Sequence, residues 1–202
     1  MIYFFDSYEK YDPEDFLKLL PENRLKKYRG LKRKRDRENC VYAYILLLRA
    51  LREEFGITQP RFDFIANGKP VLCGGGAHFN ISHCGKGLAV AVAKAPIGVD
   101  VQEARSFGDG VMKRVFSAEE TAIVNASADR EKAFARIWSL KESAVKCFAK
   151  SVAELSEFTF EGAQNHFEKY GKNFSAFELG DIYVSSCSDE EILKIMITEE
   201  LV

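Results

Sequence analysis

The stretch LAVAVAKAPIGVDV, residues 88–101, contains the pattern that decides the fold. Residues 88–93 are continuously apolar and predict a buried β-strand. A turn is expected at residues 94–96, followed by a second strand over residues 97–101. Asp100 lies inside this second strand. Because an unpaired buried carboxylate is costly, Asp100 must shift its pKa, find a partner or bind a metal.

The side chains of Asp100 and Gln102 are predicted to share one face of this strand, since alternate residues of a strand point the same way. Val99 and Val101 then lie on the other face and can join the core. Asp100 and Gln102 would together line a pocket or an interface. The alternative is a structural role for Asp100, in an ion pair with an arginine or as the cap of a turn.

The rest of the chain alternates between predicted helices and strands. Its first part predicts a strand at 2–5, a helix at 36–55 ended by Gly56, a strand at 61–66, a tight turn at Asn67-Gly68 and a loop at 74–76. Its second part predicts a helix opened by a capping box of Ser117 and Glu120, a helix at 131–148, and antiparallel strands within 157–160, 166–169, 174–179, 182–187 and 192–198. We predict an α+β fold of two packed halves, residues 1–103 and 104–202.

The composition is that of an ordinary soluble globular protein, with 47% hydrophobic residues, 29% charged residues and a net charge of −1. The net charge therefore creates no strong electrostatic field that would favour nucleic acid or a membrane as the partner. The longest apolar run, residues 41–48, is too short to span a bilayer, and the first ten residues lack a signal-peptide pattern. Five scattered cysteines favour free thiols over a disulfide framework or a zinc site. We expect a cytoplasmic protein.

The segment RIWSLKESAVKCF, residues 136–148, predicts an amphipathic helix. Its apolar face is formed by Ile137, Leu140, Ala144, Cys147 and Phe148. Ser139, Glu142 and Lys146 occupy the opposite side, and the last two lie one turn apart. Taken alone, Glu142 and Lys146 could be an ordinary pair of opposite charges on a helix surface.

Two further segments are suited to anions. Lys69, Ser82 and His83 offer a cation, a hydroxyl and an imidazole near predicted turns, which suits a phosphate. A serine nucleophile is disfavoured because no G-x-S-x-G elbow is present, and His83 could be an ordinary surface or core histidine. Residues 24–37 hold nine Lys or Arg and one Asp, which suits a small polyanion or an acidic protein surface. This basic segment could also be a solvated turn.

The order and spacing of three motifs are more specific than any one of them. FNISH at residues 79–83, PIGVDV at 96–101 and WSLKESAVK at 138–146 together resemble the larger, Sfp-type 4′-phosphopantetheinyl transferases. The resemblance implies two pseudo-symmetric α+β halves with the active site in the cleft between them. It also implies transfer of the phosphopantetheine arm of coenzyme A to a serine of an apo carrier protein (acyl, peptidyl or aryl), with release of adenosine 3′,5′-bisphosphate.

By this resemblance, Asp100 and Glu142 hold Mg²⁺, and Glu142 takes the proton of the serine directly or through a metal-bound water. Lys146 would stabilise the leaving phosphate, and Lys141 would be a second cation beside it. Many family members carry Glu at the position of Gln102. An amide oxygen can ligate a metal or orient a water but brings no charge, so we expect two carboxylates and weaker metal binding.

The resemblance also implies a binding site for coenzyme A. Lys69, Ser82, His83 and Lys146 would contact its phosphates, and Lys27 or Arg24 would meet the 3′-phosphate. The rest of the basic segment would receive an acidic helix of the carrier protein, and we expect the chain to be a monomer. Two other functions remain open: another Mg²⁺-dependent phosphoryl- or nucleotidyl-transfer enzyme, and a nucleic-acid or acidic-protein binding module built on residues 24–37.

Overall fold

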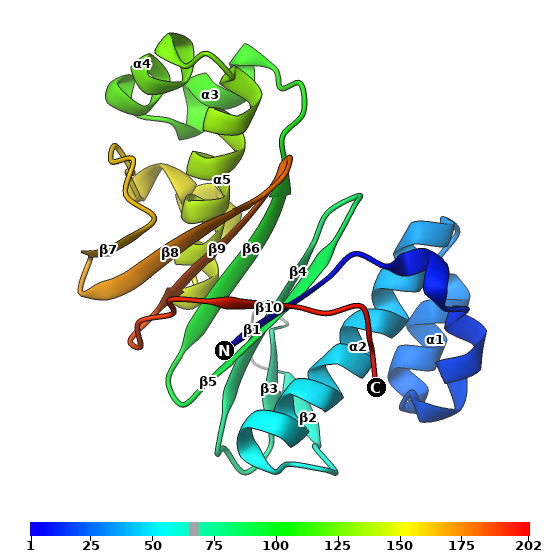
Figure 1. Cartoon of the computed structure of the whole chain (residues 1–202). Helices are drawn as coiled ribbons and strands as arrows, with labels where there is room; N and C mark the ends of the chain where they lie inside the picture. Colours follow the sequence, from blue (N-terminus) through cyan, green and yellow to red (C-terminus); the bar gives the residue numbers. More distant parts are fainter. Residues whose placement is uncertain (65–68) are drawn as a thin grey trace.

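The computed structural model describes residues 1–64 and 69–202, so the predicted turn at Asn67-Gly68 lies outside the described residues. Within these residues the chain forms two four-stranded sheets and one two-stranded hairpin (Figure 1). The predicted mixture of helices and sheets is therefore confirmed as an α+β fold. None of the described helices is long and apolar enough to cross a membrane.

The first sheet has the strand order β10-β1-β5-β4 and packs against the long helix α2. Its strands are β1 (Ile2–Phe5), β4 (His78–His83), β5 (Leu88–Ala93) and β10 (Ile195–Ile197). The helices beside it are α1 (Glu22–Gly30) and α2 (Lys34–Phe55), preceded by the 3-10 helices η1 (Tyr8–Lys10) and η2 (Pro13–Leu19). Gly56 ends α2 with a φ of +67°, a left-handed conformation that favours glycine, as the sequence predicted. The small hairpin of β2 (Phe62–Phe64) and β3 (Pro70–Leu72) extends this half.

The second sheet has the strand order β6-β9-β8-β7 and packs against helix α5 (Arg130–Cys147). Its strands are β6 (Ile97–Glu103), β7 (His166–Lys169), β8 (Lys172–Leu179) and β9 (Ile182–Ser188). The shorter helices of this half are α3 (Asp109–Val115), α4 (Ala118–Ala126) and the 3-10 helix η3 (Val152–Glu157). The predicted capping box opens α4, where the backbone N–H of Glu120 donates to Ser117 Oγ at 3.1 Å.

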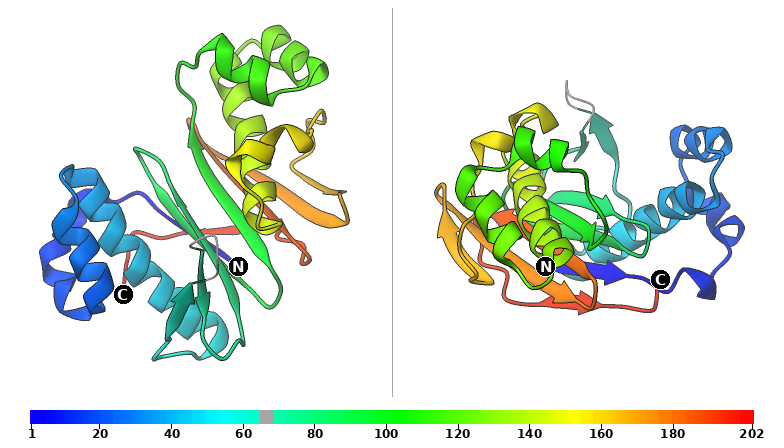
Figure 2. Two further views of the ribbon diagram at one scale, coloured as in Figure 1. Left: turned by 180° about the vertical axis from the view of Figure 1, so that it is seen from behind. Right: turned by 90° about the horizontal axis from the view of Figure 1, so that it is seen from above.

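The two halves are joined by strands that connect them in both directions. β6 precedes residue 104 but pairs with β9, and β10 follows residue 104 but pairs with β1. Figure 2 shows β6 beside the hairpin of β4 and β5, where the two halves meet. Asn80 on β4 strengthens this junction, because its Oδ1 accepts the backbone N–H of Val99 at 2.9 Å. The division of the chain at residue 104 stays a prediction.

Two of the predicted antiparallel strands differ in the structure. Residues 157–160 do not form a strand, since η3 runs through Glu157 and Phe158–Phe160 follow it as irregular chain. The strand within residues 192–198 exists as β10, but it pairs in parallel with β1 of the first sheet. Side chains take the backbone groups of the first segment, because Phe158 O accepts from Lys141 Nζ and the Phe160 N–H donates to Glu120 Oε1. The direction of pairing of β10 was predicted wrongly, because the alternation of side chains is local and does not specify the partner strand.

Candidate functional site

Asp100 lies on β6 with only 5% of its surface exposed. Its Oδ1 accepts hydrogen bonds from Lys146 Nζ at 2.6 Å and from Ser82 Oγ at 2.8 Å. Its other oxygen, Oδ2, is buried and has no hydrogen-bond partner among the described residues. Val99 and Val101 lie on the other face of β6 within an apolar cluster, as the alternation predicted. The buried carboxylate therefore has one satisfied oxygen and one that is open to a further ligand.

Glu142 and Lys146 of α5 lie next to Asp100. Lys146 Nζ is 3.8 Å from Glu142 Oε2, so one ammonium contacts the carboxylate of β6 and the carboxylate of α5. Only 15% of the Glu142 side chain is exposed. Burial, and then the negative charge of Asp100, raises the pKa of Glu142. The structure thus brings Asp100, Glu142 and Lys146 together, in place of an isolated pair of charges on a helix surface.

Helix α5 reaches this position because it packs very closely on β6. A side chain at Gly98 would overlap the backbone of α5, with its Cβ 2.5 Å from the backbone nitrogen of Cys147. On the same helix, Ser139 Oγ lies 2.7 Å from Ser185 Oγ of β9. Ser139 is therefore buried at the contact between helix and sheet, although it shares the polar side of the helix with Glu142. Glycine at position 98 lets the helix carry Glu142 and Lys146 up to Asp100.

The expectation that Lys141 is a second cation at the phosphates is wrong. Lys141 is fully buried and forms an ion pair with Glu120 at 2.8 Å, in which both side chains have 0% exposure. Its Nζ also donates to the carbonyl oxygen of Phe158. Burial lowers the pKa of Lys141. This lysine joins α5 to α4 and has no exposed side-chain surface that could meet a ligand.

Ser82 and His83 are adjacent on β4 and face opposite ways. Ser82 Oγ lies beside Asp100, Glu142 and Lys146, which together form the carboxylate cluster. It donates to Asp100 and accepts from Lys146 Nζ at 3.1 Å. His83 instead lines a cavity of about 300 Å³, together with Arg24 and Lys27 of α1. Desolvation by the surrounding protein, and then the charge of Lys146, lowers the pKa of His83. Ser82 thus belongs with the carboxylates, while His83 belongs with the basic segment.

The basic segment contributes two cations to that cavity, and they differ in their contacts. Arg24 Nη1 donates to the carbonyl oxygen of Cys40 at 2.9 Å, and its guanidinium lies 4.8 Å from the centre of the Tyr44 ring. Lys27 is exposed, and no hydrogen bond or ion pair involves it within residues 1–64 and 69–202. Of the two residues predicted to meet the 3′-phosphate, Lys27 is the more available.

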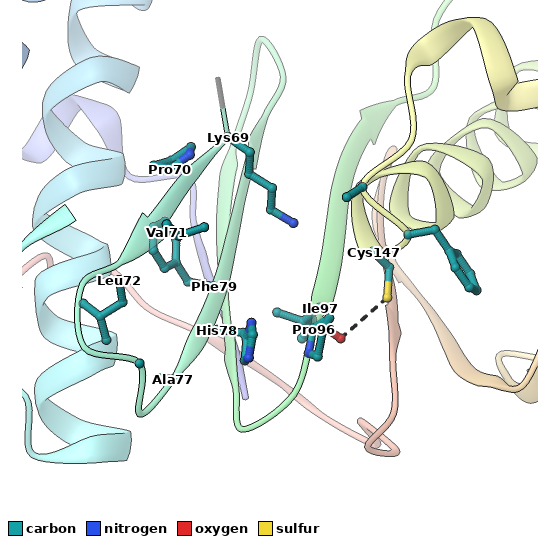
Figure 3. Close-up of a pocket in the computed structure, with 13 residues that line it drawn as sticks. Lys69, Pro70, Val71, Leu72, Ala77, His78, Phe79, Pro96, Ile97 and Cys147 are labelled. Carbon is teal, nitrogen blue, oxygen red and sulfur yellow. Dashed lines mark hydrogen bonds between the residues drawn. The ribbon is translucent and has the colours of Figure 1, made fainter. Parts of the chain in front are cut away.

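Lys69 lines a second cavity, of about 310 Å³, between the two halves of the chain (Figure 3). Its Nζ donates at 2.9 Å to the backbone carbonyl of Lys146, near the end of α5. The walls include Phe79 of β4 and Ile97 of β6. Burial lowers the pKa of Lys69. The structure therefore places the Lys69 ammonium beside the helix that carries Glu142 and Lys146.

Gln102 makes a contact that differs from the predicted one. Its Nε2 donates to the backbone carbonyl of Glu103 at 3.1 Å, whereas Glu103 itself forms an ion pair with Lys86 at 2.8 Å. The described residues contain no group of three or more His, Cys, Asp or Glu side chains that could hold a metal ion. A part for Gln102 at the carboxylate cluster stays a prediction.

Asn80 is a positioning residue that sequence reasoning missed. Its hydrogen bond to Val99 fixes β4 against β6, one residue before Asp100 and two residues before Ser82. The signal was present in the sequence, because asparagine is disfavoured inside a strand unless its amide has a partner.

Comparison with known proteins defines the class. Residues 96–192 match the sequence model of the 4′-phosphopantetheinyl transferase superfamily. This segment contains Asp100, Glu142 and Lys146. This match confirms the resemblance to 4′-phosphopantetheinyl transferases that the three motifs predicted.

Individual relatives extend the similarity into the first half. The chain is 32% identical over 130 residues to 4′-phosphopantetheinyl transferase psf-1 of Bacillus pumilus, which covers 61% of this chain and 56% of the relative. It is 28% identical over 145 residues to 4′-phosphopantetheinyl transferase Sfp of Bacillus subtilis, covering 69% and 65%. A putative 4′-phosphopantetheinyl transferase of Haemophilus influenzae is 27% identical over 169 residues, covering 79% and 69%. The matched region spans less than two thirds of the length of psf-1 and of Sfp.

Proposed function

We propose that this chain transfers the 4′-phosphopantetheine arm of coenzyme A to a serine hydroxyl of an apo carrier protein and releases adenosine 3′,5′-bisphosphate. The observation that carries the proposal is the cluster of Asp100, Glu142 and Lys146, assembled from β6 and α5. The superfamily match over residues 96–192 and the names of the relatives support it. We propose that the active form is a monomer.

The donor set at this cluster fits a magnesium ion. Asp100 Oδ2 is buried without a hydrogen-bond partner among the described residues, and the carboxylate of Glu142 lies nearby. Mg²⁺ prefers oxygen ligands and is often held by one or two carboxylates together with waters and phosphates. Asp100 and Glu142 would hold the ion, and the amide oxygen of Gln102 would be a neutral third ligand or would orient a water. When bound, the ion would neutralise the negative charge of the pyrophosphate of coenzyme A.

The remaining steps are assigned to side chains of this chain. Glu142 accepts the proton of the attacking serine hydroxyl. The ammonium of Lys146 stabilises negative charge on the leaving phosphate. Ser82 donates to Asp100 and holds this carboxylate in place. Lys146 also contacts Asp100, so movement of this ammonium toward the phosphate would release one oxygen of the carboxylate.

Coenzyme A would lie along β4, between two sets of phosphate-binding side chains. Lys69 lies at one end, beside the last turn of α5, and would meet the phosphates near the reacting centre. His83 and Lys27 line the cavity at the other end and would bind the 3′-phosphate. The remaining charges of residues 24–37, on α1 and at the start of α2, would receive an acidic helix of the carrier protein.

A transfer assay tests the proposal directly. The chain is incubated with coenzyme A, Mg²⁺ and apo carrier proteins from fatty-acid, polyketide and nonribosomal peptide synthesis, and each carrier is then weighed by mass spectrometry. We expect at least one carrier to gain the mass of a single phosphopantetheine arm, and Asp100→Ala to abolish the gain. If no carrier gains mass while the chain is folded and binds coenzyme A, the proposed activity is wrong.

Lys27→Ala should raise the KM for coenzyme A about tenfold with little change in kcat. A charge-assisted hydrogen bond to a phosphate contributes about 1.5 kcal/mol or more, and about 1.4 kcal/mol corresponds to a tenfold change in affinity. The measurement is the steady-state rate of transfer against coenzyme A concentration. Lys26→Ala is the matched control, because Lys26 lies on the same helix and does not line the cavity. Equal KM values for the two variants would place the 3′-phosphate elsewhere.

Gln102→Glu should lower the Mg²⁺ concentration that gives half-maximal activity by about three- to tenfold, because it adds a charged oxygen on the Asp100 face of β6. The measurement is a titration of transfer activity with Mg²⁺. Glu103→Gln is a suitable comparison, since Glu103 pairs with Lys86 away from the cluster. An unchanged midpoint in Gln102→Glu would exclude this residue from the metal site.

A further inference from the structure

Two buried thiols, Cys147 and Cys187, lie next to each other beneath the last turn of α5. Gly98 of β6 pairs in register with Cys187 of β9. Directly paired residues of neighbouring strands project from the same face of a sheet, so Cys187 projects toward the face that Gly98 presents to α5. A Cβ built at Gly98 would lie 3.1 Å from the Cα of Cys147. The missing side chain of Gly98 therefore brings the two cysteines together.

The two thiols differ in access. Cys147 is 6% exposed and lines the cavity of about 310 Å³ that also contains Lys69 (Figure 3). Its Sγ lies 3.5 Å from the carbonyl oxygen of Pro96 at the cavity wall. Cys187 has 0% exposure and lies behind it in the same apolar cluster. A small molecule in the cavity can therefore reach the sulfur of Cys147 but not that of Cys187.

The electrostatic surroundings of Cys147 and Cys187 also differ. The interaction with the Cys187 thiol lowers the pKa of Cys147, and the ammonium groups of Lys172 and Lys69 act in the same direction. The pKa of Cys187 is raised, first by its interaction with Cys147 and then by burial. Because the thiolate is the reactive form of cysteine, Cys147 is the more nucleophilic of the two.

We propose that Cys147 and Cys187 form a redox-active pair, in which a peroxide oxidises Cys147 and Cys187 resolves it to an intramolecular disulfide. This inference is independent of the proposed transferase activity, since it depends only on the packing of α5 on β6 and β9. It assigns a reversible modification site at the residue that directly follows Lys146.

The chemistry of the pair balances with one equivalent of hydrogen peroxide. The thiolate of Cys147 attacks one peroxide oxygen, an S–O bond forms as the O–O bond breaks, and hydroxide leaves. The sulfur of Cys187 then attacks the sulfenic acid, an S–S bond forms as the S–O bond breaks, and water leaves. The two thiols supply the two electrons, and their protons end in two molecules of water. A dithiol reductant converts the disulfide back to two thiols.

Differential alkylation tests the pair in the whole chain carrying Cys73→Ser, which removes the exposed thiol that could link two chains. The protein is treated with hydrogen peroxide, its free thiols are alkylated in denaturant, and an unreduced digest is examined by mass spectrometry. We expect peptides containing Cys147 and Cys187 to appear joined and two hydrogens lighter than their sum. Dithiothreitol should restore both as free thiols. Cys40, which is 6% exposed like Cys147 and donates to the carbonyl of Arg24, should remain alkylatable throughout.

Two variants separate the roles of the thiols. In Cys187→Ser, peroxide should leave Cys147 as a sulfenic acid that dimedone traps. In Cys147→Ser, Cys187 should remain fully alkylatable, because the residue that meets the oxidant is gone. The proposal is overturned if Cys147 and Cys187 remain free after peroxide treatment, or if Cys147 is oxidised to the sulfinic acid without any disulfide to Cys187.

Discussion

Glu142→Gln is expected to lower kcat/KM for carrier-protein modification by about a hundred- to ten-thousand-fold, the range that a positioned general base contributes. The substitution keeps the size and hydrogen-bonding capacity of the side chain and removes its charge and basicity. Glu142 is mostly buried beside Lys146 and Asp100, so no solvent-exposed carboxylate can replace it. The measurement is the initial rate of transfer at saturating Mg²⁺, with circular dichroism to confirm the fold.

Glu131→Gln is the matched control for this result, because Glu131 lies exposed in the first turn of the same helix. It should retain the activity of the unaltered chain. Equal activity of Glu142→Gln and Glu131→Gln would remove Glu142 from the reaction.

Lys141→Met is expected to reduce the free energy of unfolding by about 3–5 kcal/mol, which is the usual cost of removing one partner from a buried ion pair. Glu120 would be left as an uncompensated charge with 0% exposure. Its carboxylate also accepts the backbone N–H groups of Phe160 and Ser117, so it cannot turn toward solvent without breaking these bonds. The measurement is urea unfolding followed by circular dichroism.

The double variant Glu120→Gln with Lys141→Met distinguishes an unpaired charge from lost packing. The amide introduced by Glu120→Gln would carry no charge and could still accept a backbone N–H group, so we expect the double variant to be more stable than Lys141→Met alone. A double variant that is less stable than Lys141→Met would show that the ion pair is not the cause of the loss.

Local patterns predicted the parts of the fold that depend on neighbouring residues. The apolar run at residues 88–93, the capping box of Ser117 and Glu120, and the glycine after α2 each specify their own backbone geometry, and the structure agrees with all three. The alternation of β6 likewise predicted that Asp100 and Val99 face opposite ways. These features require only contacts within one element or a known side-chain period.

The features that sequence reasoning missed depend on residues far apart in the chain. Lys141 lies next to Glu142 in the sequence, yet one projects toward α4 and the other toward β6, because α5 is covered on more than one side. The parallel pairing of β10 with β1 joins the two ends of the described chain, and nothing in the sequence of β10 specifies that partner. The preference for Lys27 over Arg24 required knowing that the Arg24 guanidinium already has a carbonyl partner.

The central claim is that Asp100 and Glu142 hold one divalent cation together, at a place that the diphosphate of coenzyme A can reach. Electron paramagnetic resonance with Mn²⁺ as the probe ion measures this directly, because bound Mn²⁺ loses the free-ion signal. In the presence of coenzyme A, we predict one bound Mn²⁺ per chain, with at least about tenfold weaker binding in folded Asp100→Asn and in folded Glu142→Gln. Coenzyme A without protein gives the baseline. Mn²⁺ binding of unchanged affinity in both variants would contradict the account.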